Sequence, residues 1–334
     1  MSLKKPYISV IIPTYNRAEC VGEAIESVLH QTYRDFELIV VDDGSTDNTQ
    51  EILDHFSDQI RVVHQLNAGV SAARNAGILA AQSEWVAFLD SDDEWYPDAL
   101  TKLFTPFPND SKIVARVGNI DFADGALKSD LFHLRLLNLM EPAVLTRPLL
   151  RILSTWFFPS GFAARRDSLI QAGLFDSRMR YNEDADLFCR LGLLGPWLVT
   201  PQIVARVCRK TIGDCLSLSS VGDPEYHPRA MVLMFRSLLL AESMTCEEIS
   251  YVLRQLSGAW HDRAQARYIK KGKSWRYFLW KAIVEGRTAT AFIRSAPALV
   301  LGGIGFRWAE KLRSLKRSRK PSFRRSEIHA SSEK

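Results

Sequence analysis

Residues 85–95 read Trp85-Val86-Ala87-Phe88-Leu89-Asp90-Ser91-Asp92-Asp93-Glu94-Trp95. The apolar run at 85–89 is typical of a buried strand, and it ends in three carboxylates within four positions. Carboxylates this close raise one another's pKa unless a cation lies among them. Oxygen ligands favour Mg²⁺ or Mn²⁺, which commonly complete their coordination with substrate phosphates. The stretch predicts a metal-assisted phosphate site at the carboxyl end of a strand, and a solvated acidic turn is the alternative.

The rest of the first 215 residues alternates between strand and helix patterns. Apolar runs typical of strands lie at 7–12, 36–41, 60–64, 85–89, 112–122 and 203–209. Helical spacing of apolar residues is found at 18–31, 47–56, 70–81, from Pro97 onward and at 183–193. This rhythm predicts an α/β fold with a doubly wound, mostly parallel sheet.

The length of 334 residues suits one large domain with a C-terminal helical appendage, and we expect the division at 1–215 and 216–334. The net charge of +5 belongs to the C-terminus. Ten Lys or Arg and only three Glu follow Phe306, so the first 305 residues carry a net charge of −2. The main domain therefore has no basic face of the kind that binds nucleic acid.

The five cysteines lie at Cys20, Cys189, Cys208, Cys215 and Cys246, without a C-x-x-C pair. The seven histidines have no zinc-site spacing. With no secretory signal before the first strand, we expect a reducing, cytoplasmic setting, with the inner face of the plasma membrane as a site of action.

The C-terminal region joins aromatic residues to a basic tail. Trp275, Tyr277, Phe278 and Trp280 alternate with Lys and Arg, and a basic run follows the apolar segment 296–306. That segment is too short to span a bilayer comfortably. Peripheral membrane contact through the tail is one interpretation. A packed helical appendage with a solvated tail is the equally weighted alternative.

Two more strand ends carry polar residues that suit a nucleotide. The first strand delivers Pro13-Thr14-Tyr15-Asn16, and the second delivers Asp42-Asp43-Gly44-Ser45. Tyr15 offers a ring for stacking, and Asp42 offers an acceptor for a base or ribose. The chain has no P-loop and no G-x-G-x-x-G after a strand, so a diphosphate needs another means of support. Arg74, in the following segment, is placed to reach a phosphate or to buttress the acidic cluster.

In this order, five motifs resemble those of the family 2 glycosyltransferases of the GT-A fold, over roughly the first 215 residues. The motifs are Pro13-Thr14-Tyr15-Asn16, Asp42-Asp43-Gly44-Ser45, Asn67-Ala68-Gly69 with Arg74-Asn75, Asp90-Ser91-Asp92-Asp93, and Glu183-Asp184. The resemblance implies an inverting transfer of a sugar from a nucleotide-diphospho-sugar, with a UDP-sugar as the expected donor. The acceptor it implies is a hydroxyl of a glycan or lipid-linked glycan.

The resemblance also implies site residues. Those expected to bind the nucleotide are Pro13, Thr14, Tyr15, Asn16, Asp42, Arg74, Asp90 and Ser91. Those expected to hold Mn²⁺ or Mg²⁺ are Asp92, Asp90 and Asp93, and Asp184 matches the catalytic base. Ser160, Gly161 and Glu183 are expected on the acceptor side. The histidine usual in the loop over the diphosphate is absent, and Arg209 and Lys210 are the suggested substitutes.

Two other classes stay open at the level of sequence. Asp90-Ser91-Asp92 also resembles the nucleophile motif of aspartate-based phosphohydrolases, in which Asp90 would attack phosphorus and Asp92 would act as acid and base. That motif usually follows the first strand, whereas this one follows the fourth. The third class is a sugar-nucleotide-binding protein without turnover, which the presence of Asp184 disfavours.

Overall fold

The computed structural model describes residues 6–107, 110–122, 139–154, 157–208, 223, 225–270, 272, 274–287, 289–301, 306 and 328–329. The chain forms two compact units, Met1–Ile212 with Ser326–Lys334, and Gly213–Arg325. The expected division into domains 1–215 and 216–334 stays a prediction.

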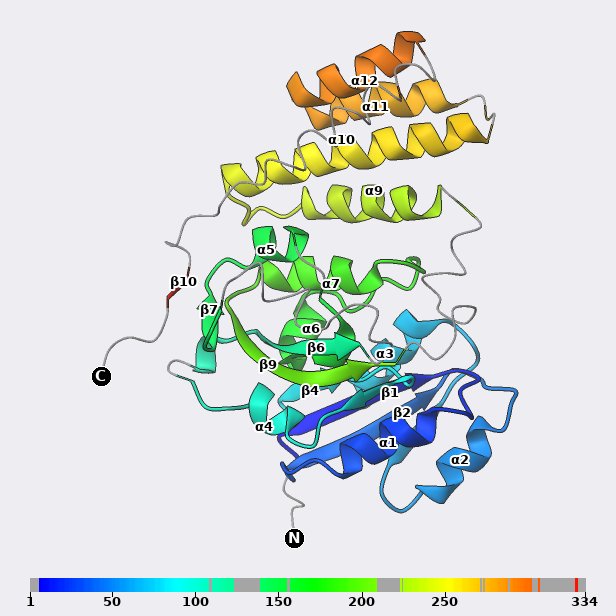
Figure 1. The fold of residues 1–334 in the computed structure, drawn as a ribbon, viewed down its shortest axis with the longest axis vertical. Coiled ribbons are helices and arrows are strands. Elements are labelled where there is room, and N and C mark those ends of the chain that lie inside the picture. The colour runs from blue at the N-terminus through cyan, green and yellow to red at the C-terminus, as the bar shows by residue number, and fades with distance from the viewer. Residues whose placement is uncertain are drawn as a thin grey trace. The chain divides into compact units, whose positions relative to one another are not determined.

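The first unit is built on a sheet with the strand order β10-β7-β9-β6-β8-β4-β1-β2-β3, and β5 pairs with β9 (Figure 1). The strands of its parallel part are β1 (Ile8–Thr14), β2 (Phe36–Asp42), β3 (Arg61–His64) and β4 (Trp85–Phe88). Because β1 pairs in parallel with both β2 and β4, the carboxyl ends of these three strands are neighbours. These are the first four strands that the sequence pattern predicts.

Helices cover both faces of this parallel part. They are α1 (Val21–Leu29), α2 (Thr49–His55), α3 (Val70–Ala80) and α4 (Ala99–Leu103). Val10 and Ile12 belong to one core with the buried face of α1, whereas Ile11 points to the opposite face and meets α3. A Cβ at Gly77 of α3 would lie 2.5 Å from the Ile11 side chain, so the close approach of this helix requires glycine.

The remaining strands of the sheet are β5 (Asp93–Trp95), β6 (Ala115–Phe122), β7 (Ala143–Leu145), β8 (Phe162–Arg165), β9 (Trp197–Val207) and β10 (Ile328–His329). β6 and β9 are parallel, and β8 runs antiparallel between β4 and β6. The helices here are η1 (Asp110–Lys112), α5 (Leu149–Ser154), η3 (Pro159–Gly161), α6 (Arg166–Gln171) and α7 (Glu183–Gly192). The predicted fold class is confirmed, although the sequence pattern gave no sign of β5, β7 or α5.

The second unit consists of α9 (Tyr226–Leu238), α10 (Cys246–Ile269), α11 (Trp275–Gly286) and α12 (Ala289–Leu301). A capping box starts α10, since the Thr245 hydroxyl accepts from the Glu248 N–H and the Glu248 carboxylate accepts from the Thr245 N–H. Val252 and Leu256 of α10 and Leu279 and Ala282 of α11 are buried. Within the described residues, no helix has the length and hydropathy of a bilayer-crossing segment.

Candidate active site

The loops that follow β1 and β2 are joined by hydrogen bonds. The Asn16 N–H donates to the Ser45 hydroxyl over 3.0 Å, and the Asn16 side-chain oxygen accepts from the Thr46 N–H over 2.7 Å. Asn16 adopts φ +51°, a left-handed conformation that asparagine tolerates better than most residues. The neighbouring Tyr15 side chain stays 44% exposed, so its ring is open to a planar ligand.

Asp42 lies opposite Thr14 in the register of β1 and β2, and its side chain is buried. Its Oδ1 accepts from the Ser45 N–H over 3.0 Å, and its Oδ2 lies 3.4 Å from Nδ1 of His64. An ionised carboxylate can accept about four hydrogen bonds, so Asp42 is held in place while acceptor capacity remains for a ligand.

Asp43 builds the loop that leads into α3. Its Oδ1 accepts from the Ala68 N–H over 2.9 Å and from the Gln65 side chain over 2.6 Å, and its Oδ2 accepts from the Gly69 N–H over 2.8 Å. Gly69 adopts φ +91° at the N-cap of α3. Asp43 is not among the site residues expected from the sequence. The pair of adjacent acids at a strand end could have indicated this role, because neighbouring side chains of a strand point to opposite sides and so meet different partners.

Arg74 joins the end of β4 to the start of α7. Its Nη2 donates to Asp90 Oδ1 over 2.7 Å and its Nη1 to Glu183 Oε1 over 3.0 Å, while its guanidinium lies 5.3 Å from the centre of the Phe175 ring. The Arg74 side chain is only 4% exposed. Burial lowers the pKa of Arg74, but Asp90 and Glu183 outweigh that effect and raise it above its usual value.

Asp93 faces the protein interior. Burial, with Asp90 and Asp92 adding to it, raises the pKa of Asp93 well above its usual value. Its carboxylate accepts from the Ser160 hydroxyl and, over 3.1 Å, from the Cys208 N–H. Asp93 therefore ties the acidic turn to η3 and to the end of β9.

Ser160 and Gly161, expected on the acceptor side, are buried in η3. The Ser160 hydroxyl also accepts from the Asp90 N–H over 3.2 Å, and its carbonyl accepts from the Trp95 indole N–H over 2.7 Å. In the structure these hydrogen bonds hold the acidic turn against η3.

Asp92, like Asp90, is half-buried, and it lies next to the buried Ser91. Burial raises the pKa of Asp92 and Asp90 adds to the effect, while Arg17 and Arg74 oppose it. A bound cation would stabilise such a carboxylate. In the described part of the chain, no three His, Cys, Asp or Glu side chains are arranged to hold a metal by themselves. The donor set fits an ion held by Asp92 and by oxygens of a substrate diphosphate, as is common for Mg²⁺.

Asp184 is the half-buried acid in the first turn of α7. Its Oδ1 accepts from the Ala185 N–H over 2.7 Å. Burial, followed by the charge of Glu183, raises the pKa of Asp184 to about 7 against the opposing effect of Arg74. A carboxyl group with this pKa can take up a proton near neutral pH, which a general base requires.

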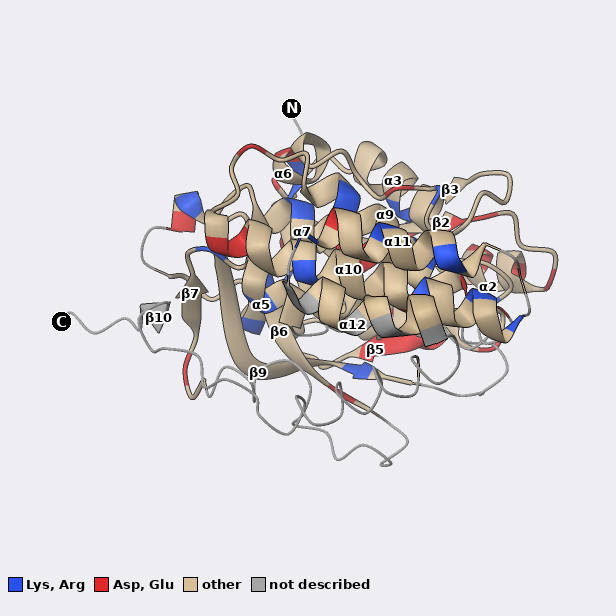
Figure 2. Ribbon diagram, turned by 90° about the horizontal axis from the view of Figure 1, so that it is seen from above, with Lys and Arg blue, Asp and Glu red and all other residues tan. Residues whose placement is uncertain are grey.

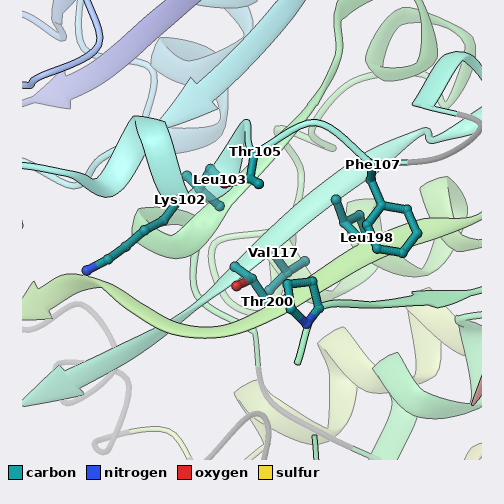
Figure 3. A pocket seen from close by; sticks show the side chains of 8 residues that line it. Lys102, Leu103, Thr105, Phe107, Val117, Leu198 and Thr200 are labelled. Atoms are coloured by element: carbon teal, nitrogen blue, oxygen red, sulfur yellow. The ribbon is translucent and has the colours of Figure 1, made fainter. Parts of the chain in front are cut away.

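The other expected site residues divide into two groups. Pro13 and Thr14 end β1, where the Thr14 carbonyl accepts from the Asp43 N–H over 2.9 Å. Arg209 and Lys210, suggested for the diphosphate, lie outside the described residues. A small pocket lies elsewhere, between α4 and strands β6 and β9 (Figure 3). None of its lining residues belongs to the expected site.

The structure thus defines a class of protein: an α/β fold whose neighbouring strand ends carry the exposed Tyr15, the buried Asp42 and the acidic turn 90–93, with Arg74 joining that turn to Glu183, next to Asp184, at the start of α7. A model of glycosyl transferase family 2 matches residues 9–173. An uncharacterised glycosyltransferase from Nostoc is 40% identical over 169 residues, 48% of this chain. The chain spans about half of that relative, since the match covers 52% of its length.

Solved structures agree on the fold. Staphylococcus aureus TarS 1–349 in complex with UDP-GlcNAc has a TM-score of 0.65 at 22% identity and covers 85% of this chain and 90% of its own. A mannosyltransferase from Pyrobaculum calidifontis in complex with GDP-Man and Mn²⁺ has a TM-score of 0.55 at 17% identity, over 95% and 87% of the two chains. The chain carries a family 2 glycosyltransferase domain of the GT-A fold.

Proposed function

We propose that the chain transfers a sugar, with inversion, from a nucleotide-diphospho-sugar to a hydroxyl of a glycan or lipid-linked glycan. A UDP-sugar is the proposed donor, because TarS is similar in fold and was solved with UDP-GlcNAc. The observation that carries the proposal is Asp184, whose pKa is raised to about 7 and whose neighbour Glu183 is joined to Asp90 through Arg74. We further propose that the protein works in the cytoplasm.

In the proposed reaction, Asp184 removes the proton from the acceptor hydroxyl while the oxygen of that hydroxyl attacks the anomeric carbon of the donor sugar. The bond from that carbon to the diphosphate breaks, and the electron pair leaves with the diphosphate. Tyr15 would stack on the nucleobase of the donor, and Asp42 would accept a hydrogen bond from an N–H of that nucleobase. When bound, Mn²⁺ or Mg²⁺ at Asp92 would supply positive charge for the departing diphosphate.

The proposal is tested by thermal unfolding with nucleotide sugars in the presence of Mn²⁺ or a chelator. A ligand that binds only the native state raises the melting temperature by mass action. We expect a UDP-sugar to raise it with Mn²⁺ and not with chelator, and the Asp92→Asn variant to lose that response. A rise that chelator leaves intact contradicts the role of the metal. The absence of a rise with every nucleotide sugar contradicts the proposed donor class.

The phosphohydrolase alternative requires Asp90 as a nucleophile. In the structure, Asp90 Oδ1 is bound by the buried Arg74 guanidinium, and the family match covers the stretch that contains it. Release of phosphate from a simple phosphate monoester would restore this alternative.

Membrane contact was one of the two interpretations of the basic tail, and its residues 307–327 lie outside the described part of the chain. We propose that this tail adds electrostatic attraction to an anionic leaflet, which would suit a lipid-linked acceptor.

A further inference from the structure

Helix α11 divides its aromatic residues between two faces. Trp275 and Phe278 are buried, and the Phe278 ring stacks on Trp260 of α10 with ring centres 5.7 Å apart. Tyr277 and Trp280, in contrast, are 53% and 49% exposed. Half of the aromatic cluster in this segment therefore belongs to the core of the helical unit, and the other half faces solvent.

The exposed half forms a stripe, the α11 stripe, made of Tyr277, Trp280 and Val284. These positions are three and four residues apart and so lie along one side of the helix. The rings of Tyr277 and Trp280 are stacked, with their centres 6.3 Å apart and their planes at 28°. Two neighbouring rings without a cover differ from the single exposed apolar residues that are normal on a protein surface.

Cations lie beside the α11 stripe, and Figure 2 colours the Lys and Arg positions of the ribbon blue. The Lys281 ammonium lies 5.7 Å from the centre of the Tyr277 ring and 5.6 Å from that of Trp280. Arg276 also lies on this helix and is exposed. The single acid of α11, Glu285, is engaged by Lys281 and by the indole N–H of Trp260. Amphipathic rings with adjacent cations are typical of the boundary between a bilayer and water.

We infer that the α11 stripe docks on the surface of an anionic phospholipid bilayer, with the two rings at the level of the headgroups. Charge complementarity selects this occupant. Residues 307–325, which follow α12, contain nine Lys or Arg and a single Glu, so the same part of the chain supplies a second, electrostatic attraction. Stable peripheral binding usually needs two such contributions. This inference rests on the proposed function only in that docking on a bilayer would suit a lipid-linked acceptor. The docking itself does not depend on the transfer chemistry.

Vesicle co-sedimentation tests the inference at low and high salt, using phosphatidylcholine vesicles with and without phosphatidylglycerol. Salt screens the tail but not the insertion of rings. We expect the full chain to bind the anionic vesicles and to retain part of that binding in high salt. The variant with Tyr277→Ser and Trp280→Ser should lose the salt-resistant part, with partition about tenfold lower. A tail variant with Arg317→Gln, Arg319→Gln and Lys320→Gln, which removes three of the nine cations, should weaken the salt-sensitive part and leave the salt-resistant part unchanged.

The matched control is Leu240→Ser, because Leu240 is 84% exposed in the same helical unit but lies outside α11. It should bind as the unchanged chain does. Equal vesicle binding by the ring variant and the unchanged chain would overturn the inference. So would a ring variant that dissociates an oligomer in sedimentation velocity while its vesicle binding is unchanged, since the occupant would then be a second copy.

Sugar transfer to a water-soluble acceptor separates this inference from the proposed function. Transfer that persists in the ring variant, together with lost vesicle binding, supports the docking. Transfer without any vesicle binding by the unchanged chain rejects the docking and leaves the proposed function standing.

Discussion

The end of β4 and the start of α7 both place acids side by side, yet the two regions neutralise them differently. At the end of β4, Asp90 binds Arg74, and Asp93 accepts hydrogen bonds from Ser160 and Cys208. At the start of α7, Glu183 forms an ion pair with the other terminal nitrogen of Arg74. Asp184 accepts one hydrogen bond, from the adjacent Ala185 N–H, and no ion pair to it is found in the described part of the chain.

The difference assigns separate tasks to similar side chains. The hydrogen bonds of Asp93 fix the backbone of the acidic turn, although burial, with Asp90 and Asp92 adding to it, still raises the pKa of Asp93 well above its usual value. A half-buried carboxyl group beside a like charge holds its proton up to higher pH, and the pKa of Asp184 is accordingly raised to about 7. The proposed base is thus an acid with a raised pKa and one hydrogen bond, from the adjacent Ala185 N–H.

The largest expected effect comes from Asp184→Asn, which keeps the shape of the side chain and removes its basicity. Turnover should fall about 10²- to 10⁴-fold, while donor affinity stays nearly the same. Steady-state kinetics and a donor titration measure the two. Glu51→Gln, at an exposed acid of α2, is the control and should leave both unchanged. Unaltered turnover in Asp184→Asn would remove this residue from the mechanism.

Next in size is the effect of Arg74→Met, which removes the cation shared by the two regions. Breaking a buried ion pair by removing one partner costs about 3–5 kcal/mol, because a buried charge is left uncompensated. Urea denaturation should show that loss of unfolding free energy. Arg178→Met removes an exposed arginine paired with Asp176 and should give no resolvable change. Equal denaturation midpoints for the two variants would show that the shared cation does not stabilise the fold.

A smaller loss of unfolding free energy is expected from Ser160→Ala, which tests the hydrogen bonds at the end of β4. The substitution removes a donor to Asp93 and an acceptor for the Asp90 N–H. Leaving a buried polar group without its partner costs about 1–3 kcal/mol. Urea denaturation measures it against Ser57→Ala, at an exposed serine. A loss no larger than that of the control would mean that solvent replaces these bonds.

The most gradual effect is that of pH, through Asp184. Turnover should rise as pH rises through about 7, because only the ionised carboxylate removes a proton. The native state holds this proton to higher pH than the unfolded chain, whose Asp pKa is about 3.9. The unfolding free energy of metal-free protein should therefore fall as pH rises from about 4 towards 7. Asp184→Asn should flatten the turnover profile and reduce the slope of the stability profile, to which Asp92 and Asp93 also contribute. Profiles that keep their shape would assign the pH dependence to another group.

The sequence predicts most of the parallel half of the sheet, because the apolar strands 7–12, 36–41 and 85–89 are read from local periodicity. It does not predict how β8 enters the sheet, since the antiparallel pairing of Val86 with Ala164 depends on packing between distant segments. The candidate site shows the same limit. Asp90, Asp92 and Asp93 look alike in sequence, and they are told apart by Arg74, by solvent and by Ser160.

Those partners are far away along the chain. Ser160 is 67 residues from Asp93, and Glu183 is 109 residues from Arg74. Motif order alone brought Glu183-Asp184 into the expected site, through the resemblance, while the hydrogen bonds of Asp43 with Gly69 went unforeseen. Local pattern therefore finds the residues that carry chemistry better than it finds those that support them.

The shared guanidinium has a consequence for any shortened form of the protein. The family match ends at residue 173, whereas one of the two acids bound to Arg74 is Glu183. A fragment cut at the end of the match would keep every motif from Pro13 to Asp93 and still lose one of the two carboxylates that pair with the buried Arg74. Such a fragment would leave one end of the Arg74 guanidinium without its partner, so we expect the first unit to need residues beyond the family match.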